Sequence, residues 1–403
     1  VTNELEDYIN SLTAADVTTM DFEEAKKAGL VEIVDPMNDY IDSILSFVDI
    51  DKIKAKKLKI LLDPMFGVSK TSLQTILLTC RCDVDVINDR HDTLFGGRLP
   101  SPSAKTLTRL STMVVEGGYD LGIATDGDAD RIGLVIRDNN GEYVLINGNQ
   151  IVMIFLNYLM TRNTELGTLT GNEYIVKTIV TTETIRTIAE AQHIKMYDCF
   201  TGFKWIANVM RENEGKARYL GGGEESYGFL AEDFVRDKDS VSAISLMAEI
   251  AAWAKDKGLN MTDMLIDIYM KYGFSREKGI SLVRKGKSGA EEIIALMKQF
   301  RENPPKEIAG SPVVTVKDCQ SLVETNVATG ETKKLDMPAT SNVLQYYTAD
   351  RTKVSVRPSG TEPKIKFYIE VHDTLASADE YKATEARADE KINRIAKEFG
   401  ITK

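Results

Sequence analysis

Three aspartates stand at alternate positions in the segment Thr125-Asp126-Gly127-Asp128-Ala129-Asp130-Arg131, which separates two apolar stretches. Carboxylates this close repel one another, and a bound cation relieves the repulsion. Hard divalent cations also prefer several carboxylate oxygens from one compact loop. We therefore predict that Asp126, Asp128 and Asp130 hold a divalent metal ion. A polar hairpin turn is the alternative, since Asp and Gly both favour turns.

A glycine-rich segment, Gly221-Gly222-Gly223-Glu224-Glu225-Ser226-Tyr227-Gly228, combines a flexible backbone with two carboxylates and a hydroxyl. Paired hydrogen-bond acceptors of this kind suit the recognition of neighbouring hydroxyl groups on a sugar. A glycine-rich connection with solvated acidic side chains explains the segment equally well. This stretch alone does not separate the two interpretations.

A third segment, Arg357-Pro358-Ser359-Gly360-Thr361-Glu362-Pro363-Lys364, lies between two predicted strands. Its guanidinium fork, its two hydroxyls and its glycine are suited to binding a phosphate or another oxyanion. It is not a Walker loop, which ends in Gly-Lys-Ser/Thr. A turn flanked by ordinary charges is the alternative.

The overall composition restricts the class of protein to which these segments can belong. The chain has 403 residues, of which 43% are hydrophobic and 28% charged, with a net charge of −11. This acidity argues against a nucleic-acid partner, which would need a basic surface. The longest apolar run, residues 151–160, is about half of a membrane span. The four cysteines form no C-x-x-C or zinc pattern, so we expect reduced thiols and a cytoplasmic protein.

Alternating strand and helix patterns predict how the three segments are positioned. The pattern predicts strands at residues 58–63, 84–87 and 174–179 and helices at 182–191 and 241–257, which favours α/β layers with largely parallel sheets. Residues 354–357 and 365–371 alternate like strands, and Ser377 with Glu380 predicts a capping box for a final helix that ends before Gly400. We expect two α/β domains and a C-terminal α+β domain, with boundaries at residues 1–40, 41–166, 167–274 and 275–403.

Taken in this order, the three segments resemble the magnesium, sugar-binding and phosphate-binding loops of the α-D-phosphohexomutase family. Supporting stretches also match, and the resemblance covers nearly the whole chain: Asp63-Pro64-Met65-Phe66-Gly67, Thr201-Gly202-Phe203-Lys204 and Arg236-Asp237-Lys238-Asp239. The Gly-Glu-Glu-Ser sequence is similar to the phosphoglucomutase form, whereas phosphomannomutases more often have Gly-Glu-Met-Ser and phosphoglucosamine mutases Gly-Glu-Gln-Ser. Gly228 stands where some relatives have a histidine, so no histidine acid can be carried over.

The resemblance implies a multi-domain α/β fold around one cleft and a role for each matched residue. Mg²⁺ would be held by Asp126, Asp128 and Asp130, and Arg131 would hold the transferring phosphoryl group. Sugar hydroxyls would be held by Glu224 and Ser226, in a pocket also lined by Thr201, Gly202 and Lys204. Arg131 and Lys204 would be the catalytic residues that this chain supplies. The phosphate that is not transferred would be held by Arg357, Ser359, Gly360 and Thr361.

One departure from the family pattern is large. The family's nucleophile is a serine in a Thr-Ala-Ser-His-Asn-Pro-like loop of the first domain, and no such motif occurs here. Ser101 and Ser103 resemble part of the second domain instead, and a first-domain basic residue often proposed as general base would also be missing. We expect residues 1–40 to be the end of that first domain, and the chain alone to be inactive.

The implied activity is that of an isomerase, a phosphoglucomutase that interconverts glucose 1-phosphate and glucose 6-phosphate. A phosphoserine enzyme would act through glucose 1,6-bisphosphate, which also serves as activator, on a phosphorylated hexose. Four alternatives stay open: a phosphomannomutase, a phosphopentomutase, a magnesium-dependent phosphatase with Asp126 as nucleophile, and a phosphosugar-binding protein without activity.

Overall fold

The computed structural model describes residues 2–284, 286–359 and 362–401, which form two units, 1–43 and 44–403. The first unit holds short helices, and neither η1 nor α2 has a buried residue; their bounds are α1 (Thr2–Ser11), η1 (Ala14–Asp16) and α2 (Phe22–Lys27). Asp21 begins α2 by accepting hydrogen bonds from the backbone N–H groups of Glu23 and Glu24. Helix α3 (Met37–Phe47) runs across the division between the units.

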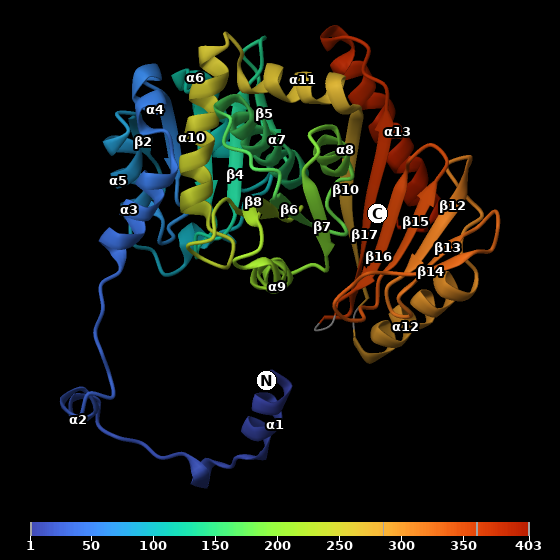
Figure 1. Ribbon diagram of the computed structural model, residues 1–403, viewed down its shortest axis with the longest axis horizontal. Coiled ribbons are helices and arrows are strands. Elements are labelled where there is room, and N and C mark those ends of the chain that lie inside the picture. Colours follow the sequence, from blue (N-terminus) through green and yellow to red (C-terminus); the bar gives the residue numbers. More distant parts are fainter. Residues whose placement is uncertain (1, 285, 360–361, 402–403) are drawn as a thin grey trace. The chain divides into compact units, whose positions relative to one another are not determined.

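The first sheet of the second unit has five strands in the order β2-β1-β3-β4-β5; Figure 1 labels β2, β4 and β5. Strand β1 pairs in parallel with β2 and β3, while β4 and β5 continue the sheet as antiparallel strands. The elements of this part are α4 (Ile50–Lys56), β1 (Lys59–Asp63), α5 (Lys70–Thr79), β2 (Asp83–Val86), η2 (Phe95–Gly97), α6 (Thr108–Gly117), β3 (Leu121–Thr125), β4 (Ile132–Arg137) and β5 (Tyr143–Ile146).

A four-stranded sheet follows in the order β7-β6-β8-β9, with β6 pairing in parallel with β7 and β8. Helices α7 and α10 are buried over most of their length, because they fill the space beside this sheet and the first. The elements are α7 (Gly148–Leu166), β6 (Glu173–Thr178), α8 (Thr184–Ala191), β7 (Lys195–Cys199), α9 (Phe203–Asn213), β8 (Arg218–Gly223), β9 (Phe229–Leu230), α10 (Ser240–Asp256) and α11 (Met261–Tyr272).

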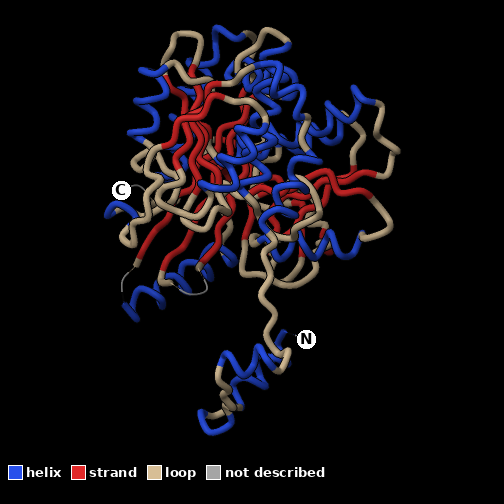
Figure 2. The backbone as a smooth tube through the Cα atoms, turned by 90° about the vertical axis from the view of Figure 1, so that its left-hand side faces the viewer, coloured by secondary structure: helices blue, strands red, loops and turns tan. Residues whose placement is uncertain are grey.

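The C-terminal part is a fully antiparallel sheet in the order β10-β17-β16-β15-β12-β13-β14, with β11 paired to β12. Helices α12 and α13 contact its strands. Figure 2 shows the strands in red and the helices in blue. The elements are β10 (Phe274–Val283), α12 (Gly286–Glu302), β11 (Glu307–Ile308), β12 (Ser311–Asp318), β13 (Val323–Asn326), β14 (Thr332–Lys334), β15 (Leu344–Thr348), β16 (Lys353–Pro358), β17 (Lys364–Asp373), η3 (Ala378–Glu380) and α13 (Tyr381–Glu398).

The start of the last helix differs from the sequence prediction. Ser377 precedes the short 3₁₀ turn η3 and its side chain makes no capping hydrogen bond, while α13 begins only at Tyr381. The predicted capping box is therefore wrong, because the 3₁₀ turn intervenes between Ser377 and the α-helix. The end of the helix is as predicted: Gly400 has φ +66° and its N–H donates to the carbonyl oxygen of Lys397 at 3.0 Å.

The second and third sheets are joined by a buried ionic network. Lys353 of β16 is 1% exposed, and its Nζ lies 2.9 Å from an oxygen of Glu183 and 2.9 Å from an oxygen of Glu370. Lys177 of β6 is fully buried and lies 3.0 Å from Glu183. An apolar cluster that includes Ile179 and Val343 packs beside these charges. The network fixes β16, which carries Arg357, to the preceding sheet.

Among the described residues, no helix combines the length and the apolar character that crossing a membrane requires.

Candidate functional site

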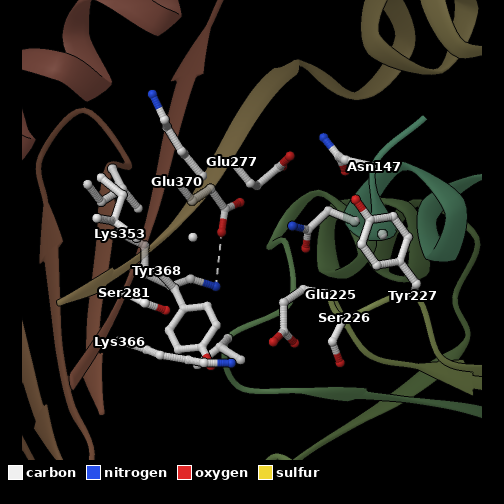
Figure 3. A pocket seen from close by; sticks show the side chains of 17 residues that line it. Asn147, Glu225, Ser226, Tyr227, Glu277, Ser281, Lys353, Lys366, Tyr368 and Glu370 are labelled. Carbon is white, nitrogen blue, oxygen red and sulfur yellow. Dashed lines mark ion pairs between the residues drawn. The ribbon is translucent and has the colours of Figure 1, made fainter. Parts of the chain in front are cut away.

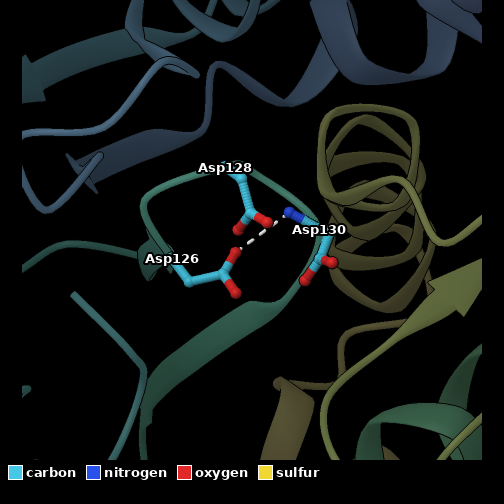
Figure 4. Close-up of side chains that lie close together, drawn as sticks. All are labelled: Asp126, Asp128 and Asp130. Carbon is cyan, nitrogen blue, oxygen red and sulfur yellow. Dashed lines mark hydrogen bonds between the residues drawn. The ribbon is translucent and has the colours of Figure 1, made fainter. Parts of the chain in front are cut away.

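The aspartate-rich segment is the loop of a hairpin between β3 and β4, whose last paired residues are Thr125 and Ile132. Asp126 is 6% exposed, and its Oδ1 accepts hydrogen bonds from the backbone N–H groups of Asp130 and Arg131, each at 2.9 Å. Figure 4 shows the first of these bonds. These bonds fold the loop back so that the alternate carboxylates converge. One oxygen from each of Asp126, Asp128 and Asp130 lies within 4.8 Å of the others.

The charges of this loop fit a cation. Burial raises the pKa of Asp126 to about 6, and the neighbouring negative charge of Asp130 adds to that shift. Oδ1 of Asp130 is buried and has no hydrogen-bond partner among the described residues, as expected of a ligand atom. Hence the aspartates can hold a metal ion, and the carboxylate chemistry suits a hard divalent one.

Two basic side chains border the aspartates. Nε of Arg131 lies 3.6 Å from Asp126 and 3.5 Å from Asp130, and Nζ of Lys238 lies 2.5 Å from Oδ2 of Asp130. Lys238 reaches the loop because Ser240, at the start of α10, donates its hydroxyl to the carbonyl oxygen of Ala129 at 2.6 Å. The Arg236-Asp237-Lys238-Asp239 stretch therefore lies against the aspartate-rich segment 125–131, called the metal loop below.

The Asp63-Pro64-Met65-Phe66-Gly67 stretch supports the metal loop from the other side. A Cβ atom at Gly67 would lie 2.5 Å from the carbonyl oxygen of Gly127, so only glycine allows this approach. The N–H of Val68 donates to the same oxygen at 3.2 Å. Ser69 directly precedes α5 but makes no capping hydrogen bond; its hydroxyl forms a 2.8 Å hydrogen bond with Thr125 at the base of the metal loop.

The second segment is the loop between β8 and β9, which pair at Gly223 and Phe229. Glu224 is 7% exposed, and its Oε1 accepts a hydrogen bond from the N–H of Gly202 at 2.6 Å. Gly202 and Glu224, predicted to share a pocket, are thus brought together. The N–H of Ile132 donates to the carbonyl oxygen of Tyr227 at 3.1 Å, which links this loop to the metal loop.

Glu224 lies in a field of positive charge from several elements. Burial raises the pKa of Glu224, while its hydrogen bond from Gly202 and the positive charges of Lys238, Arg131 and Arg357 act in the opposite direction. These cations belong to the metal loop, its neighbouring stretch and the third segment. The three predicted loops therefore approach one another around Glu224.

A cavity of about 300 Å³ separates the second segment from the C-terminal sheet. In Figure 3, Glu225 and Ser226 lie on one side of it and Lys366 and Tyr368 of β17 on the other. Burial raises the pKa of Glu225 to about 7, and the negative charge of Glu224 adds to the shift. Burial lowers the pKa of Lys366, although the negative charge of Glu225 opposes that change.

The third segment connects β16 to β17, where Arg357 pairs with Lys366 across the strands. The N–H of Ser359 donates to the carbonyl oxygen of Lys364 at 2.8 Å, and the Ser359 hydroxyl oxygen accepts from the N–H of Glu362 at 3.3 Å. Gly360 and Thr361, which were also predicted to bind phosphate, lie outside the described residues.

Lys204 is the predicted site residue with the weakest connection to the others. It is exposed in the first turn of α9, where its Nζ lies 5.5 Å from the centre of the Trp205 ring. Thr201 lies directly before Gly202 and is half-buried.

Sequence reasoning missed two basic residues at the site, Lys238 and Lys366. Lys238 stood in a supporting stretch without an assigned role, and nothing local indicated its contact with Asp130. Lys366 could have been found, because the alternation of a strand places it on the same face as Lys364.

Three parts of the chain match models of known protein domains. Residues 38–141, 147–272 and 313–388 match the models of phosphoglucomutase/phosphomannomutase α/β/α domain II, α/β/α domain III and C-terminal domain, together about three quarters of the chain. The chain belongs to the phosphoglucomutase/phosphomannomutase family. The predicted resemblance to the phosphohexomutases and the predicted multi-domain α/β fold are thereby confirmed.

Two relatives indicate where the chain stands within this family. It is 36% identical over 250 residues to a phosphoglucomutase of Staphylococcus epidermidis and 34% identical over 250 residues to one of Staphylococcus haemolyticus. Each match covers 62% of this chain and 45% and 44% of the respective relative. The chain therefore matches less than half the length of these relatives.

Solved structures share the fold at lower identity. Parafusin, a phosphoglucomutase from Paramecium, superposes with a TM-score of 0.66 at 20% identity, covering 91% of this chain and 63% of that one. A phosphomannomutase homologue from Thermus thermophilus superposes with a TM-score of 0.61 at 18% identity, covering 90% and 67%.

Proposed function

We propose that this chain supplies the metal-, sugar- and phosphate-binding parts of a phosphoglucomutase, which interconverts glucose 1-phosphate and glucose 6-phosphate through glucose 1,6-bisphosphate. The observation that carries the proposal is the position of Glu224, a buried carboxylate that accepts a 2.6 Å hydrogen bond from Gly202 and is acted on by the positive charges of Lys238, Arg131 and Arg357. A hexose bisphosphate needs acceptors for its hydroxyls at the centre and a cation for each phosphate. The phosphoglucomutase names of the relatives and the Gly-Glu-Glu-Ser sequence support glucose as the sugar.

Binding is divided among the loops. Glu224 and Ser226 would hold sugar hydroxyls, and the 2.6 Å hydrogen bond from Gly202 would keep the Glu224 carboxylate in place. The phosphate that is not transferred would lie against Arg357 and Ser359, with Gly360 and Thr361 assigned to the same role by resemblance. Thr201 and Lys204 would border the sugar.

The transferring phosphoryl group would lie at the other end of the sugar, near Arg131. Asp126, Asp128 and Asp130 would hold Mg²⁺, which when bound neutralises charge on the phosphoryl group. Arg131 would add a guanidinium to the same group, and Lys238 would keep Asp130 oriented when no ligand is present. Phosphoryl transfer rests mainly on such positioning and charge neutralisation.

The reaction proceeds in two balanced steps. In the first, the bond between phosphorus and the serine oxygen of a phosphoserine breaks while the sugar's free hydroxyl oxygen bonds to phosphorus. The hydroxyl proton is released, and the serine oxygen gains one. In the second step the bisphosphate is bound in the opposite orientation. The serine oxygen loses its proton and bonds to the phosphorus of the other phosphoryl group, the bond from that phosphorus to the sugar oxygen breaks, and the sugar oxygen gains a proton. Neither the serine nor the base that accepts the proton is assigned to a residue of this chain.

The proposal includes several finer points. The metal ion is Mg²⁺, and the binding partner is a phosphorylated hexose. The chain is divided into domains of residues 41–166, 167–274 and 275–403. A cytoplasmic location is supported by the four cysteines, all of which are free and buried.

The test is a calorimetric titration of the chain with glucose 1,6-bisphosphate in the presence of Mg²⁺. We expect saturable binding that Arg357→Ala weakens at least tenfold, about 1.4 kcal/mol. Arg394→Ala is the matched control, because Arg394 is exposed on α13 of the same domain. Mannose 1,6-bisphosphate is expected to bind more weakly. A folded chain that binds neither bisphosphate would contradict the assignment. So would an affinity for glucose 1,6-bisphosphate that Arg357→Ala leaves unchanged.

A further inference from the structure

A second cavity, of about 220 Å³, lies in the first α/β part of the second unit. It opens beyond the carboxyl ends of two parallel strands, since Phe66 follows β1 and Arg90 follows β2. Three arginines line it, together with two half-buried aromatic rings; these residues are Arg90, Arg98, Arg109, Phe66 and Phe95. The lining includes no residue of the three loops assigned to the hexose site.

The single acidic residue of the lining is already occupied. Asp63 is 2% exposed, and its two carboxylate oxygens accept hydrogen bonds from Nδ2 of Asn88 at 3.0 and 2.9 Å. Oδ1 of Asp63 also accepts from the N–H of Met65 at 2.9 Å. Asn88 in turn accepts a hydrogen bond from Nη1 of Arg109 at 3.2 Å, which holds that guanidinium at the cavity. Asp63 thus positions Arg109 through Asn88 without a direct ion pair. Burial raises the pKa of Asp63, while the positive charges of Arg109 and Arg98 act in the opposite direction.

Two of the three arginines form no ion pair in the described part of the chain, and the carboxylate of Asp63 faces the charges of both. Arg98 and Arg109 take part in no ion pair there, whereas Arg90 has a 3.2 Å contact with Asp92. The guanidinium of Arg90 also lies over the ring of Phe66, 5.7 Å from its centre. In a protein of net charge −11, two unpaired guanidinium groups at one concavity favour an anionic ligand.

The topology of the sheet points to the same edge. In open α/β sheets, ligands bind beyond the carboxyl ends of the parallel strands, at the point where the strand order reverses. Here the order β2-β1-β3 places that reversal between β1 and β3, and the cavity lies at the same edge of the sheet, next to it, beyond β1 and β2. Phe95 and Pro100 separate the cavity from the metal loop, because both would lie within 3.4 Å of a Cβ atom at Gly127.

We propose that this cavity binds a phosphomonoester, at a site separate from the hexose site. The phosphate oxygens would accept hydrogen bonds from the guanidinium groups of Arg98 and Arg109, and the esterified group would lie against the rings of Phe66 and Phe95. The volume suits a ligand of roughly ten non-hydrogen atoms whose organic part is apolar or planar. The rings therefore favour an aromatic monoester over inorganic phosphate.

The experiment is a calorimetric titration with phenyl phosphate, with inorganic phosphate as the comparison probe. The Arg357→Ala variant of the full chain is used, so that binding at the hexose site is suppressed. We expect phenyl phosphate to bind this variant, more tightly than inorganic phosphate does. Adding Arg98→Ala should weaken binding at least tenfold, and Arg98→Lys should restore part of it, because lysine keeps the charge without the planar fork.

Arg211→Ala is the matched control, since Arg211 is an exposed arginine on α9, and it should leave the affinity unchanged. Arg98 is the variant of choice because its side chain makes no hydrogen bond among the described residues, and its one backbone hydrogen bond, to Phe95, is kept in an alanine variant. Circular dichroism and the thermal midpoint establish that each variant is folded. No binding of phenyl phosphate to Arg357→Ala, or equal affinity with and without Arg98, would overturn the proposal and leave the hexose assignment intact.

Discussion

Replacing Lys353 by methionine tests the buried network that holds the phosphate-binding strand. Lys353 is 1% exposed and lies 2.9 Å from both Glu183 and Glu370. Its Nζ also donates to the carbonyl oxygen of Thr181 at 2.9 Å. The variant keeps the length and apolar stem of lysine, so it removes the charge with little change in packing.

The expected loss follows from what remains around each carboxylate. Breaking a buried pair by removing one partner costs about 3–5 kcal/mol, because the other charge stays buried. Glu183 keeps Lys177 at 3.0 Å and Arg186 at 3.0 Å, but Glu370 keeps only His372, at 3.0 Å, among its ion-pair partners in the described chain. We therefore expect the free energy of unfolding to fall by about 3 kcal/mol near neutral pH.

The pH dependence has a definite sign. Burial by itself would raise the pKa of Glu370, but the positive charge of Lys353 and the hydrogen bond from His372 lower it to about 2, from 4.5 in the unfolded chain. A carboxyl of this kind stabilises the fold above about pH 4.5 and loses that contribution as the pH falls toward 2. Lys353→Met removes the main cause of the lowered pKa. The difference in stability between wild type and variant should therefore be largest near pH 7 and shrink on acidification.

Urea unfolding followed by the fluorescence of Trp205 measures this effect, because Trp205 packs beside the apolar cluster between the two sheets. Trp253→Phe in every sample removes the second tryptophan. Lys391→Met is the control, since its partner Asp350 is 43% exposed and such pairs contribute about 0–1 kcal/mol. Equal losses for both lysine variants, or a Lys353 loss that does not change with pH, would refute the reasoning.

Three further outcomes are expected. Gly67→Ala should lower the free energy of unfolding by about 1–3 kcal/mol and weaken Mg²⁺ binding, because the new Cβ would lie 2.5 Å from a carbonyl oxygen of the metal loop. Gly279→Ala is the control, because a Cβ there meets nothing within 4 Å, and it should change neither quantity. Calorimetry measures both the stability and the Mg²⁺ affinity. Asp128→Asn should weaken Mg²⁺ binding roughly tenfold or more, whereas Asp51→Asn, at a side chain 99% exposed, should not. Burial raises the pKa of Glu225 to about 7, so the fold should become less stable as the pH rises from 4.5 through 7 and this buried carboxyl must ionise. Glu225→Gln should flatten that part of the curve of stability against pH, measured by urea unfolding.

The sequence sufficed for features formed by neighbouring residues. The metal loop is one: alternate aspartates between two paired strands converge because the backbone N–H groups of Asp130 and Arg131 bind Asp126, a few residues away. The alternation of strands and helices likewise indicated the α/β layers before any contact was known. The start of the last helix was misjudged because the sequence Ser377-x-x-Glu380 fits a 3₁₀ turn as well as a capping box.

Features that join distant segments depended on the tertiary structure. Lysines are usually exposed, so nothing in the local sequence indicated that Lys353 would be buried with Glu183, which stands far from it in the chain. The contact of Lys238 with Asp130 and the unpaired charges of Arg98 and Arg109 are of the same kind. Local hydrogen bonding and strand periodicity act over a few residues and can be read in order along the chain. Burial and the pairing of charges between sheets are decided by which sheets pack together. That packing brings Lys353 to Glu183 and places the charge of Arg357 where it acts on Glu224.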